Sequence, residues 1–354
     1  MSSMSLPVHG RGSSSNPMNR FETIRLEIDE EHRAPDDLDS PAPSTEFFAD
    51  TSRSIIAEND SPDVGFRFSI NPYRGCEHGC IYCYARPTHE YLSLSSGLDF
   101  ESKIFVKQDS PELLRRALSK SSWNGETISI SGVTDCYQPA EKKFLLTRSC
   151  LEVLNEFHNP VGVITKSHLI TRDIDLLSQM ARHHLVMCFL SITTLDVELS
   201  RRMEPRAAIP QRRLDAIRQL TCAGIPCGVM VAPVIPGLTD HEMPQILNAA
   251  ADAGAVTCGY VPVRLPFAIK DMFETWLAQH YPDRKLKVLN RIRGMRGGKL
   301  NSSEFHDRMR GQGQFADQMK QMFEIAKRKA GLDKPCPELR KDLFRRPREQ
   351  MRLF

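Results

Sequence analysis

Short apolar runs alternate with stretches of helical periodicity between Phe66 and Val263, and this alternation is the strongest constraint on the fold. Six of the runs are typical of strands: Phe66–Ile70, Thr127–Ser131, Val161–Thr165, Val186–Ile192, Ile225–Pro233 and Val256–Val263. The helical patterns that connect them cover Glu112–Lys120, Glu141–His158, Arg172–His184, Ile209–Ala223 and His241–Ala253. Strands joined through helices run parallel with right-handed crossovers. The sequence therefore predicts an α/β fold whose parallel sheet has too few strands to close an eight-stranded barrel.

Three cysteines stand close together directly after the first predicted strand. Cys76, Cys80 and Cys83 have the spacing C-x3-C-x2-C within Asn71–Arg86. Thiolates are soft ligands that bind zinc or iron–sulfur clusters, and a structural zinc site usually has four protein ligands. Here the fourth ligand of a zinc site would have to be His78, between the first two cysteines. If three cysteines instead hold a 4Fe–4S cluster, one iron is left open to a substrate or cofactor.

The strand, the cysteine spacing and Tyr82 just before the last cysteine resemble the signature of radical S-adenosylmethionine (SAM) enzymes. The resemblance implies a partial (β/α)6 barrel and a 4Fe–4S cluster on Cys76, Cys80 and Cys83. In that family SAM chelates the open iron, and an electron from the cluster cleaves it to methionine and a 5′-deoxyadenosyl radical. The family also implies an electron donor such as flavodoxin or ferredoxin. A structural zinc loop or a non-enzymatic metal-sensing module is the alternative.

Residues that follow the predicted strands are the candidates for contacts with SAM, because chemistry in parallel barrels takes place at the carboxyl ends of the strands. Thr134 and Asp135 follow the second strand, where the resemblance implies acceptors for the ammonium group of SAM. Lys166 follows the third strand and would neutralise the carboxylate of SAM. Ser191 and Thr193 end the fourth strand, within reach of that carboxylate or the ribose. The alternative for Thr134 and Asp135 is a simple turn at the start of a helix. The alternative for Lys166 is an exposed lysine, and that for Ser191 and Thr193 is the hydroxyl residues that are common at strand ends.

Two further residues complete the predicted site for SAM, and one cysteine is a candidate for catalysis. Tyr82 lies within the cysteine loop, and Ile235 belongs to the apolar stretch after the fifth strand that resembles the family's adenine contact. Asp240 in that stretch stands where the family more usually has Glu. Cys136 lies on a loop of the predicted active face, where a thiol can donate a hydrogen atom to a carbon radical. A small buried cysteine is the alternative.

Three more stretches resemble the spore photoproduct lyase branch of the family: Thr165–Ser167, Leu190–Thr194 and Glu204–Pro205. That lyase repairs a thymine dimer in DNA by radical reversal, after which a cysteine returns a hydrogen atom. The resemblance therefore implies a lyase that acts in DNA repair. The cysteine of the lyase stands before the Asp of its loop, at a position matched here by Gly132, whereas Cys136 follows Asp135. The alternative is the same radical chemistry on a small molecule or a peptide.

An acidic residue and several arginines stand together in Met203–Arg206 and at Arg212 and Arg213. Guanidinium groups can bind a carboxylate or phosphate in a bidentate manner. Ion pairing on a helix surface is the preferred interpretation of Arg212 and Arg213.

The net charge of +3 is unevenly distributed along the chain. Residues 1–64 carry 5 basic and 13 acidic side chains, a charge of −8. Residues 284–354 carry 20 basic and 8 acidic side chains, a charge of +12. A basic C-terminal region can be the footprint of DNA or another nucleic acid, but charge alone favours a solvated helical surface or a cover for the acidic N-terminal arm.

The chain divides into three predicted parts. Residues 1–62 are rich in Ser, Pro, Asp and Glu, which predicts a largely disordered extension. The alternative is an arm ordered against the core through its apolar residues Phe47, Phe48, Ile55 and Ile56. Residues 63–265 form the predicted radical SAM barrel, and residues 266–354 form a basic, mainly helical extension.

Composition and cysteine usage indicate a cytoplasmic protein. Hydrophobic residues make up 40% of the chain and charged residues 26%, as in an ordinary soluble protein. No apolar run approaches the ~20 residues of a membrane span, so no membrane contact is expected. The polar first residues contain no apolar signal segment. Ten cysteines without such a signal are expected to stay reduced, as a thiolate-bound cluster requires.

Overall fold

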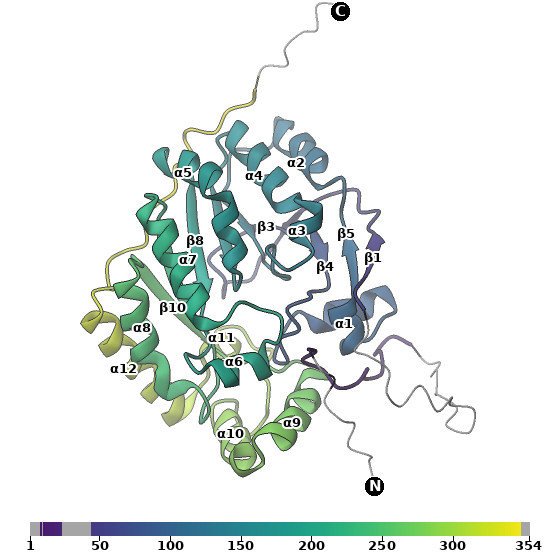
Figure 1. Cartoon of the computed structure of the whole chain (residues 1–354), viewed down its shortest axis with the longest axis vertical. Helices are drawn as coiled ribbons and strands as arrows, with labels where there is room; N and C mark the ends of the chain where they lie inside the picture. The colour runs from purple at the N-terminus through teal and green to yellow at the C-terminus, as the bar shows by residue number, and fades with distance from the viewer. Residues whose placement is uncertain (1–7, 9, 23–43, 348–354) are drawn as a thin grey trace, which may run out of the picture.

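The chain is represented by a computed structural model that describes residues 8, 10–22 and 44–347. Within this part, the main sheet has the strand order β10-β9-β8-β7-β6-β3-β2 (Figure 1). Its parallel strands are β3 (Phe68–Ile70), β6 (Ile128–Ile130), β7 (Val161–Thr165), β8 (Val186–Ser191), β9 (Cys227–Val234) and β10 (Thr257–Pro262). β2 (Ile56–Glu58) is antiparallel and forms one edge. β10 forms the other edge, so the sheet is open and the predicted partial (β/α)6 barrel is confirmed.

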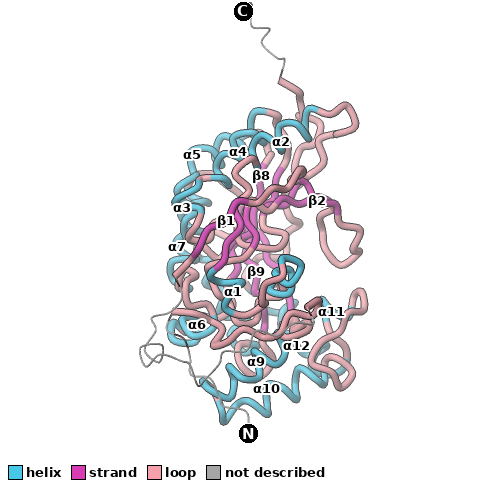
Figure 2. The backbone as a smooth tube through the Cα atoms, turned by 90° about the vertical axis from the view of Figure 1, so that its right-hand side faces the viewer, coloured by secondary structure: helices cyan, strands magenta, loops and turns pink. Residues whose placement is uncertain are grey.

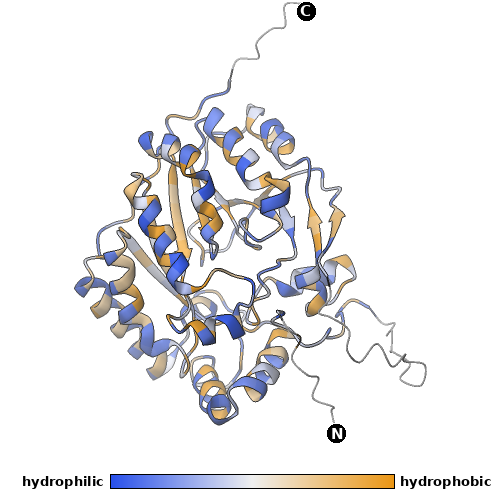
Figure 3. Cartoon of the chain, viewed as in Figure 1, coloured by the Kyte–Doolittle hydropathy of each residue, from blue (hydrophilic) through white to orange (hydrophobic). Residues whose placement is uncertain are grey.

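Helices follow the strands and cover the outer face of the sheet. They are α2 (Ser110–Ser119), α4 (Leu146–Glu156), α5 (Ile174–Arg182), α7 (Pro210–Cys222) and α8 (Met243–Asp252). Figure 3 shows hydrophobic strands, and helices whose hydrophilic residues face outward. Because a covered parallel sheet excludes water, its strands are apolar along most of their length. Val161, Val163, Cys188, Leu190 and Val229 are accordingly buried.

The sequence predicts one helix over Glu141–His158, but the structure divides this segment. α3 (Glu141–Phe144) ends at Leu145, whose φ of 55° is left-handed, and α4 begins at the next residue. The Glu141 carboxylate accepts hydrogen bonds from the backbone N–H groups of Thr147 (2.9 Å) and Arg148 (3.3 Å). These bonds satisfy donors of the first turn of α4, as a capping residue does. The prediction of one continuous helix is therefore wrong, because the Glu141 side chain caps the first turn of α4.

The sequence does not predict two short helices, which lie at the same end of the barrel as the cysteine loop. α1 (Leu98–Ser102) lies between the cysteine loop and β5. α6 (Val197–Met203) begins after Asp196, whose side chain accepts from the N–H groups of Glu198 and Leu199. The segment before α5 forms a 3-10 helix, η4 (His168–Asp173). The α-helix predicted to begin at Arg172 therefore begins at Ile174.

A second, small sheet stands beside the barrel and leads into the cysteine loop. Its strand order is β1-β5-β4, with β1 (Glu46–Ala49), β5 (Lys103–Val106) and β4 (Tyr73–Arg74). The cysteine loop follows β4 and ends at the 3-10 helix η3 (Arg86–Leu92). Figure 2 shows β1 and α1 on the side of the molecule turned toward the viewer.

The predicted disorder of residues 1–62 needs correction for the described residues of this range. Phe47 and Phe48 belong to β1 and contact the rings of Phe144 and Phe105, with centroids 5.0 and 5.3 Å apart. Ile55 is buried in the main core. The ordered arm, which the sequence left as the alternative, therefore describes residues 44–62. Residues 23–43 lie outside the described part, and the domain boundaries at 62 and 265 stay a prediction.

The C-terminal region is mainly helical, as predicted. It contains α9 (Ile269–His280), α10 (Pro282–Gly294), α11 (Asp307–Arg310) and α12 (Gly313–Lys329), and α12 packs beside α8. Among the described residues, none of the helices combines the length and the apolar character needed to cross a membrane.

The arginine-rich tail, residues 335–347, runs along the end of the barrel opposite to α9 and α10 (Figures 1 and 2). The backbone N–H groups of Arg340 and Arg345 donate to the carbonyls of His184 and Phe157, both at 2.9 Å. Arg346 Nη2 donates to the carbonyl of Trp123 (2.6 Å). These three carbonyls precede β8, β7 and β6, so the tail crosses the amino ends of the strands.

Candidate functional site

The three cysteines lie on a tightly turned loop at the carboxyl ends of the strands. Cys76 N–H donates to the Phe100 carbonyl (2.9 Å), and Cys83 N–H donates to the Cys80 carbonyl (3.2 Å). Cys76 and Cys80 are buried, and Cys83 is partly buried. Burial raises the pKa of all three thiols, and the carboxylate of Asp135 raises that of Cys76 further. Without a cation these cysteines are therefore neutral, and metal binding would release their protons.

The donor set fits an iron–sulfur cluster better than a single zinc ion. Within the part of the chain that is described, no three His, Cys, Asp or Glu side chains converge as ligands of one metal ion. In a 4Fe–4S cluster each cysteine binds a different iron, so the three sulfurs need not meet at one point. His78, the alternative fourth zinc ligand, has its Nδ1 3.4 Å from Asp135 Oδ2.

Arg86, the last residue of the motif, holds the cysteine loop from within the protein. Its side chain is completely buried. Nε donates to the Cys80 carbonyl (2.9 Å), Nη2 donates to the Gly79 carbonyl (3.0 Å), and Nη1 donates to the Gly97 carbonyl (3.0 Å). Nη2 also pairs with Glu101 Oε1 at 2.6 Å, and Glu101 is fully buried as well. The loop therefore rests on a guanidinium whose charge and donors are satisfied.

An N-terminal segment, residues 10–22, lies against the cysteine loop, and we call it the N-terminal strap. Glu101 holds it, because its carboxylate accepts the N–H groups of Gly12 (2.9 Å) and Ser13 (2.8 Å). A Cβ at Gly12 would stand 1.8 Å from the carbonyl oxygen of Gly79, so this approach requires glycine. The prediction of disorder is therefore also corrected for residues 10–22.

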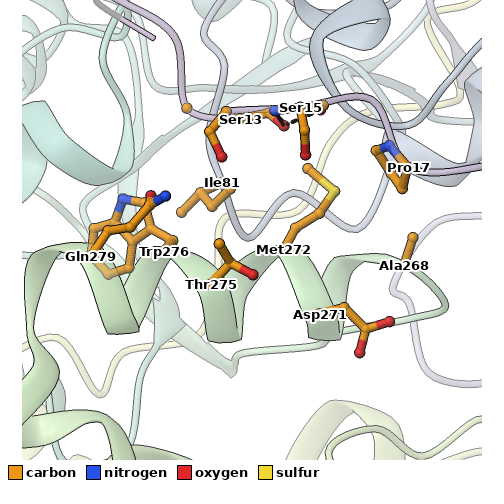
Figure 4. Close-up of a pocket in the computed structure, with 12 residues that line it drawn as sticks. Ser13, Ser15, Pro17, Ile81, Ala268, Asp271, Met272, Thr275, Trp276 and Gln279 are labelled. Atoms are coloured by element: carbon orange, nitrogen blue, oxygen red, sulfur yellow. Dashed lines mark hydrogen bonds between the residues drawn. The ribbon is translucent and has the colours of Figure 1, made fainter. Parts of the chain in front are cut away.

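A cavity of about 140 Å³ separates the N-terminal strap from α9. Figure 4 shows Ser13 and Ser15 on one side of it, and Met272, Thr275 and Trp276 of α9 on the other. None of the residues that the sequence predicts to contact SAM lines this cavity. Ile81 of the cysteine loop is one of the lining residues, so the cavity borders this loop.

Asp135 connects the cysteine loop with the end of β7. Oδ1 accepts from Thr165 Oγ1 (2.6 Å), and Oδ2 accepts from the N–H of Lys166 (2.7 Å). Burial raises the pKa of this carboxyl, but the effects of His78, Thr165 and the Lys166 N–H outweigh burial and lower the pKa to about 2. The Thr134 hydroxyl donates to the Tyr73 carbonyl (2.7 Å). Both predicted acceptors of the SAM ammonium thus already have partners within the protein, and their role toward SAM stays a prediction.

Lys166 lies where the ends of β7 and β9 meet the cysteine loop. Its Nζ donates to the Ala232 carbonyl (3.1 Å) and lies 5.9 Å from the centroid of the Tyr82 ring. No described carboxylate forms an ion pair with Nζ, so a bound anion can pair with it, although its charge also lowers the pKa of the buried Glu204.

A buried hydrogen-bond network joins Tyr82 to the end of β8. The Tyr82 hydroxyl donates to Glu204 Oε1 and lies 3.2 Å from Thr193 Oγ1. Thr193 Oγ1 also donates to Glu204 Oε1 (2.8 Å). Arg213 pairs with Glu204 and is 1% exposed, so the helix-surface interpretation of Arg213 is wrong. Arg212, in contrast, is exposed as predicted and lies 3.8 Å from Asp215.

The other predicted residues lie around this network or away from it. Ser191 is buried, and its carbonyl accepts from Arg213 Nη1 (2.9 Å). Ile235 belongs to the same apolar cluster as Cys80 and Tyr82. Cys136 is 1% exposed and belongs to the main hydrophobic core, which favours the structural interpretation of this cysteine.

Comparison with known proteins relates the chain to a large enzyme group. The family model of the Radical SAM superfamily matches residues 70–250, just over half of the chain. An uncharacterized protein of Mycobacterium tuberculosis is 38% identical over 220 residues, which are 62% of this chain and 65% of that protein. The chain thus spans slightly less than two thirds of the length of its mycobacterial relatives.

Two further matches extend the comparison. The radical SAM Nalpha-GlyT isomerase of Pseudomonas phage M6 is 28% identical over 172 residues, which cover 48% of this chain and 34% of the phage protein. The structure of spore photoproduct lyase complexed with dinucleoside spore photoproduct matches with a TM-score of 0.56 and 15% identity, over 80% of this chain and 79% of that one. At this identity the second likeness concerns the fold.

Proposed function

This chain belongs to the Radical SAM superfamily, and from this premise we propose that it is an enzyme that holds a 4Fe–4S cluster on Cys76, Cys80 and Cys83. Such a cluster, when bound, supplies the electron that cleaves SAM to methionine and a 5′-deoxyadenosyl radical. The observation that carries the proposal is the burial of thiols on a loop that Arg86 and Glu101 hold in place. Reduced flavodoxin or ferredoxin is the electron donor that we propose.

The residues around the loop have distinct proposed roles toward SAM. Lys166 binds the carboxylate, because its ammonium has no ion-pair partner among the described residues and lies beside Tyr82. Ile235 contacts the adenine, and Ser191 and Thr193 contact the ribose or the carboxylate. Thr193 acts there as an acceptor, since its hydroxyl has two acceptors within the protein, Glu204 Oε1 (2.8 Å) and the Ala232 carbonyl (3.1 Å).

Asp135 and Thr134 are proposed to position the site, and the ammonium of SAM is their second candidate partner. The Asp135 carboxylate fixes the end of β7, including Lys166, against His78 of the cysteine loop. A residue that orients Lys166 and the cysteine loop at once determines their relative geometry.

DNA is the substrate proposed first, and the likeness in fold to spore photoproduct lyase supports this choice. The arginine-rich tail does not, because Arg340, Arg345 and Arg346 are bound to the opposite end of the barrel. A small molecule or a peptide is the second candidate, and the position of the tail favours it over binding of nucleic acid by this region.

Anaerobic reconstitution tests the function. The protein is loaded with iron and sulfide, reduced with dithionite and given SAM, and 5′-deoxyadenosine is measured together with bound iron and sulfide. We expect the wild type to bind four irons per chain and to form the nucleoside, at a rate at least about 100-fold above that of Cys80→Ala. Cys222→Ala is the matched control, because Cys222 is exposed and outside the loop. A wild type with an intact cluster but no nucleoside would contradict the proposal, and stoichiometric zinc without sulfide would indicate the structural alternative.

A further inference from the structure

Arg264 lies two residues beyond the end of β10 and beside the cysteine loop. Its Cζ stands 5.4 Å from the ring centroid of Tyr84, the residue after Cys83. The Tyr84 hydroxyl donates to the carbonyl of Gly132 (2.9 Å), in the loop after β6. Tyr84 therefore connects the end of β6 with the end of β10 and fixes Arg264 next to the third cysteine.

The guanidinium of Arg264 lacks the partners that such a group normally has. Its Nη1 contacts Met309 Sδ at 3.4 Å, and a thioether is a weak acceptor. Its Nε is buried and has no hydrogen-bond partner among the described residues. None of the described Asp and Glu side chains forms an ion pair with it. A guanidinium in this setting retains donors and a charge that a ligand can satisfy.

Neighbouring arginines increase the positive charge at this place. Arg296 is buried, donates from Nη2 to the Val263 carbonyl (3.2 Å), and also has no ion-pair partner in the described part of the chain. Arg308 is neutralised by Asp63, with Nε 2.6 Å from Oδ2. Burial and the charge of Arg308 lower the pKa of Arg264, while burial and the charge of Arg264 lower that of Arg296 to about 10. The charge of Arg264 thus disfavours the charged form of Arg296, and an anion bound at this place would reduce the repulsion.

We propose that Arg264, stacked on Tyr84, binds an oxyanion of the substrate, either a phosphate or a carboxylate. The planar fork of a guanidinium matches two oxygens of either group. Tyr84 is 47% exposed, so this place is open to a substrate. The carboxylate of SAM is assigned above to Lys166, the residue after β7, which leaves Arg264 for the second reactant. The proposal rests on the proposed function, since it describes the substrate of that enzyme.

Modification by phenylglyoxal, an arginine reagent, tests the site on the reconstituted holoenzyme. The rate of modification of each arginine is followed by peptide mass spectrometry, with and without inorganic phosphate or acetate. We expect saturable protection of Arg264 by at least about tenfold, as one charge-assisted hydrogen-bond pair predicts. Arg293 is the matched control, because it lies in α10, three residues before Arg296, and donates to Asn290 (3.2 Å) at the surface.

The results of this experiment test the proposed oxyanion site separately from the proposed function. Absence of protection by both anions, or equal protection of Arg293, would overturn the proposal. Protection by a single-stranded thymidine decamer would identify a phosphodiester, whereas protection by the free anions alone would indicate a small acidic substrate. Formation of 5′-deoxyadenosine by the same wild-type sample tests the proposed function independently of this result.

Discussion

Arg86 and Arg264 both border the cysteine loop, but only the guanidinium of Arg86 forms an ion pair with a described carboxylate. Arg86 is completely buried, pairs with Glu101 and donates to several carbonyls of the loop. Arg264 is partly buried, and in the described part of the chain it pairs with no carboxylate and its Nε has no hydrogen-bond partner. A buried charge that is fully partnered maintains a structure, while one that is left without a partner costs stability and is available to a ligand. The comparison therefore distinguishes Arg86, which stabilises the cysteine loop, from Arg264, which is proposed to bind the substrate.

The largest effect should follow from removing the partner of Arg86. Glu101→Ala leaves a buried guanidinium without a counter-charge and takes the acceptor away from the strap residues Gly12 and Ser13. The free energy of unfolding should fall by about 3–5 kcal/mol, the range for a broken buried ion pair. Urea denaturation at neutral pH measures this loss.

A matched control for this variant is Glu156→Ala. Glu156 pairs with Arg115 at 2.5 Å, but both side chains are about 40% exposed. Its removal should cost less than about 1 kcal/mol, because water screens an exposed ion pair. Equal losses in the two variants would show that Arg86 and Glu101 do not hold the loop.

The fold was predictable from the sequence because it depends on local patterns. The run from Val161 to Thr165 has the same bounds in the prediction and in β7. Such runs are buried by any neighbouring strand and helix, so their identity does not depend on distant partners. Where a specific side chain decided the structure, as when Glu141 capped α4, periodicity predicted the wrong element.

The support of the candidate site was not predictable, since it is built from contacts between distant residues. The strap residues Gly12 and Ser13 have a composition typical of disorder, and they are ordered by a carboxylate 89 and 88 positions away. Arg86 is the last residue of the sequence motif, but no feature near it in the sequence identifies Glu101 as its partner. Helical spacing predicts Arg213 on a helix surface, because spacing does not reveal a buried partner such as Glu204.

A second fully partnered charge, Glu204, should appear as a pH dependence of stability. Burial raises the pKa of this carboxyl, but Arg213 and Lys166 outweigh burial and lower it from 4.5 to about 2. A carboxyl with a lowered pKa in the folded state stabilises the protein above its unfolded pKa, and the contribution is lost as the pH falls toward the folded pKa. Between pH 6 and pH 3 the wild type should lose about 2 kcal/mol through this group.

Glu204→Gln removes this titration, so its stability should decline less steeply over the same pH range, whatever its stability at neutral pH. Urea unfolding at several pH values gives the two slopes. Glu198→Gln is the control, because Glu198 is 65% exposed and its ion pair with Arg201 lies in solvent. Parallel slopes for the wild type and Glu204→Gln would assign the acid sensitivity to other groups.

The smallest effect on stability should come from Arg264, and it is the sharpest test of the comparison. Arg264→Met keeps an apolar contact with Tyr84 and removes a charge that has no described ion-pair partner. The free energy of unfolding should change by less than about 0.5 kcal/mol or should rise, because the loss of the contacts with the Tyr84 ring and Met309 Sδ is offset by the removal of a desolvated charge. Thermal or urea unfolding beside Arg293→Met measures this difference. A loss as large as that of Glu101→Ala would mean that Arg264, like Arg86, holds the structure, and the oxyanion would then need another partner.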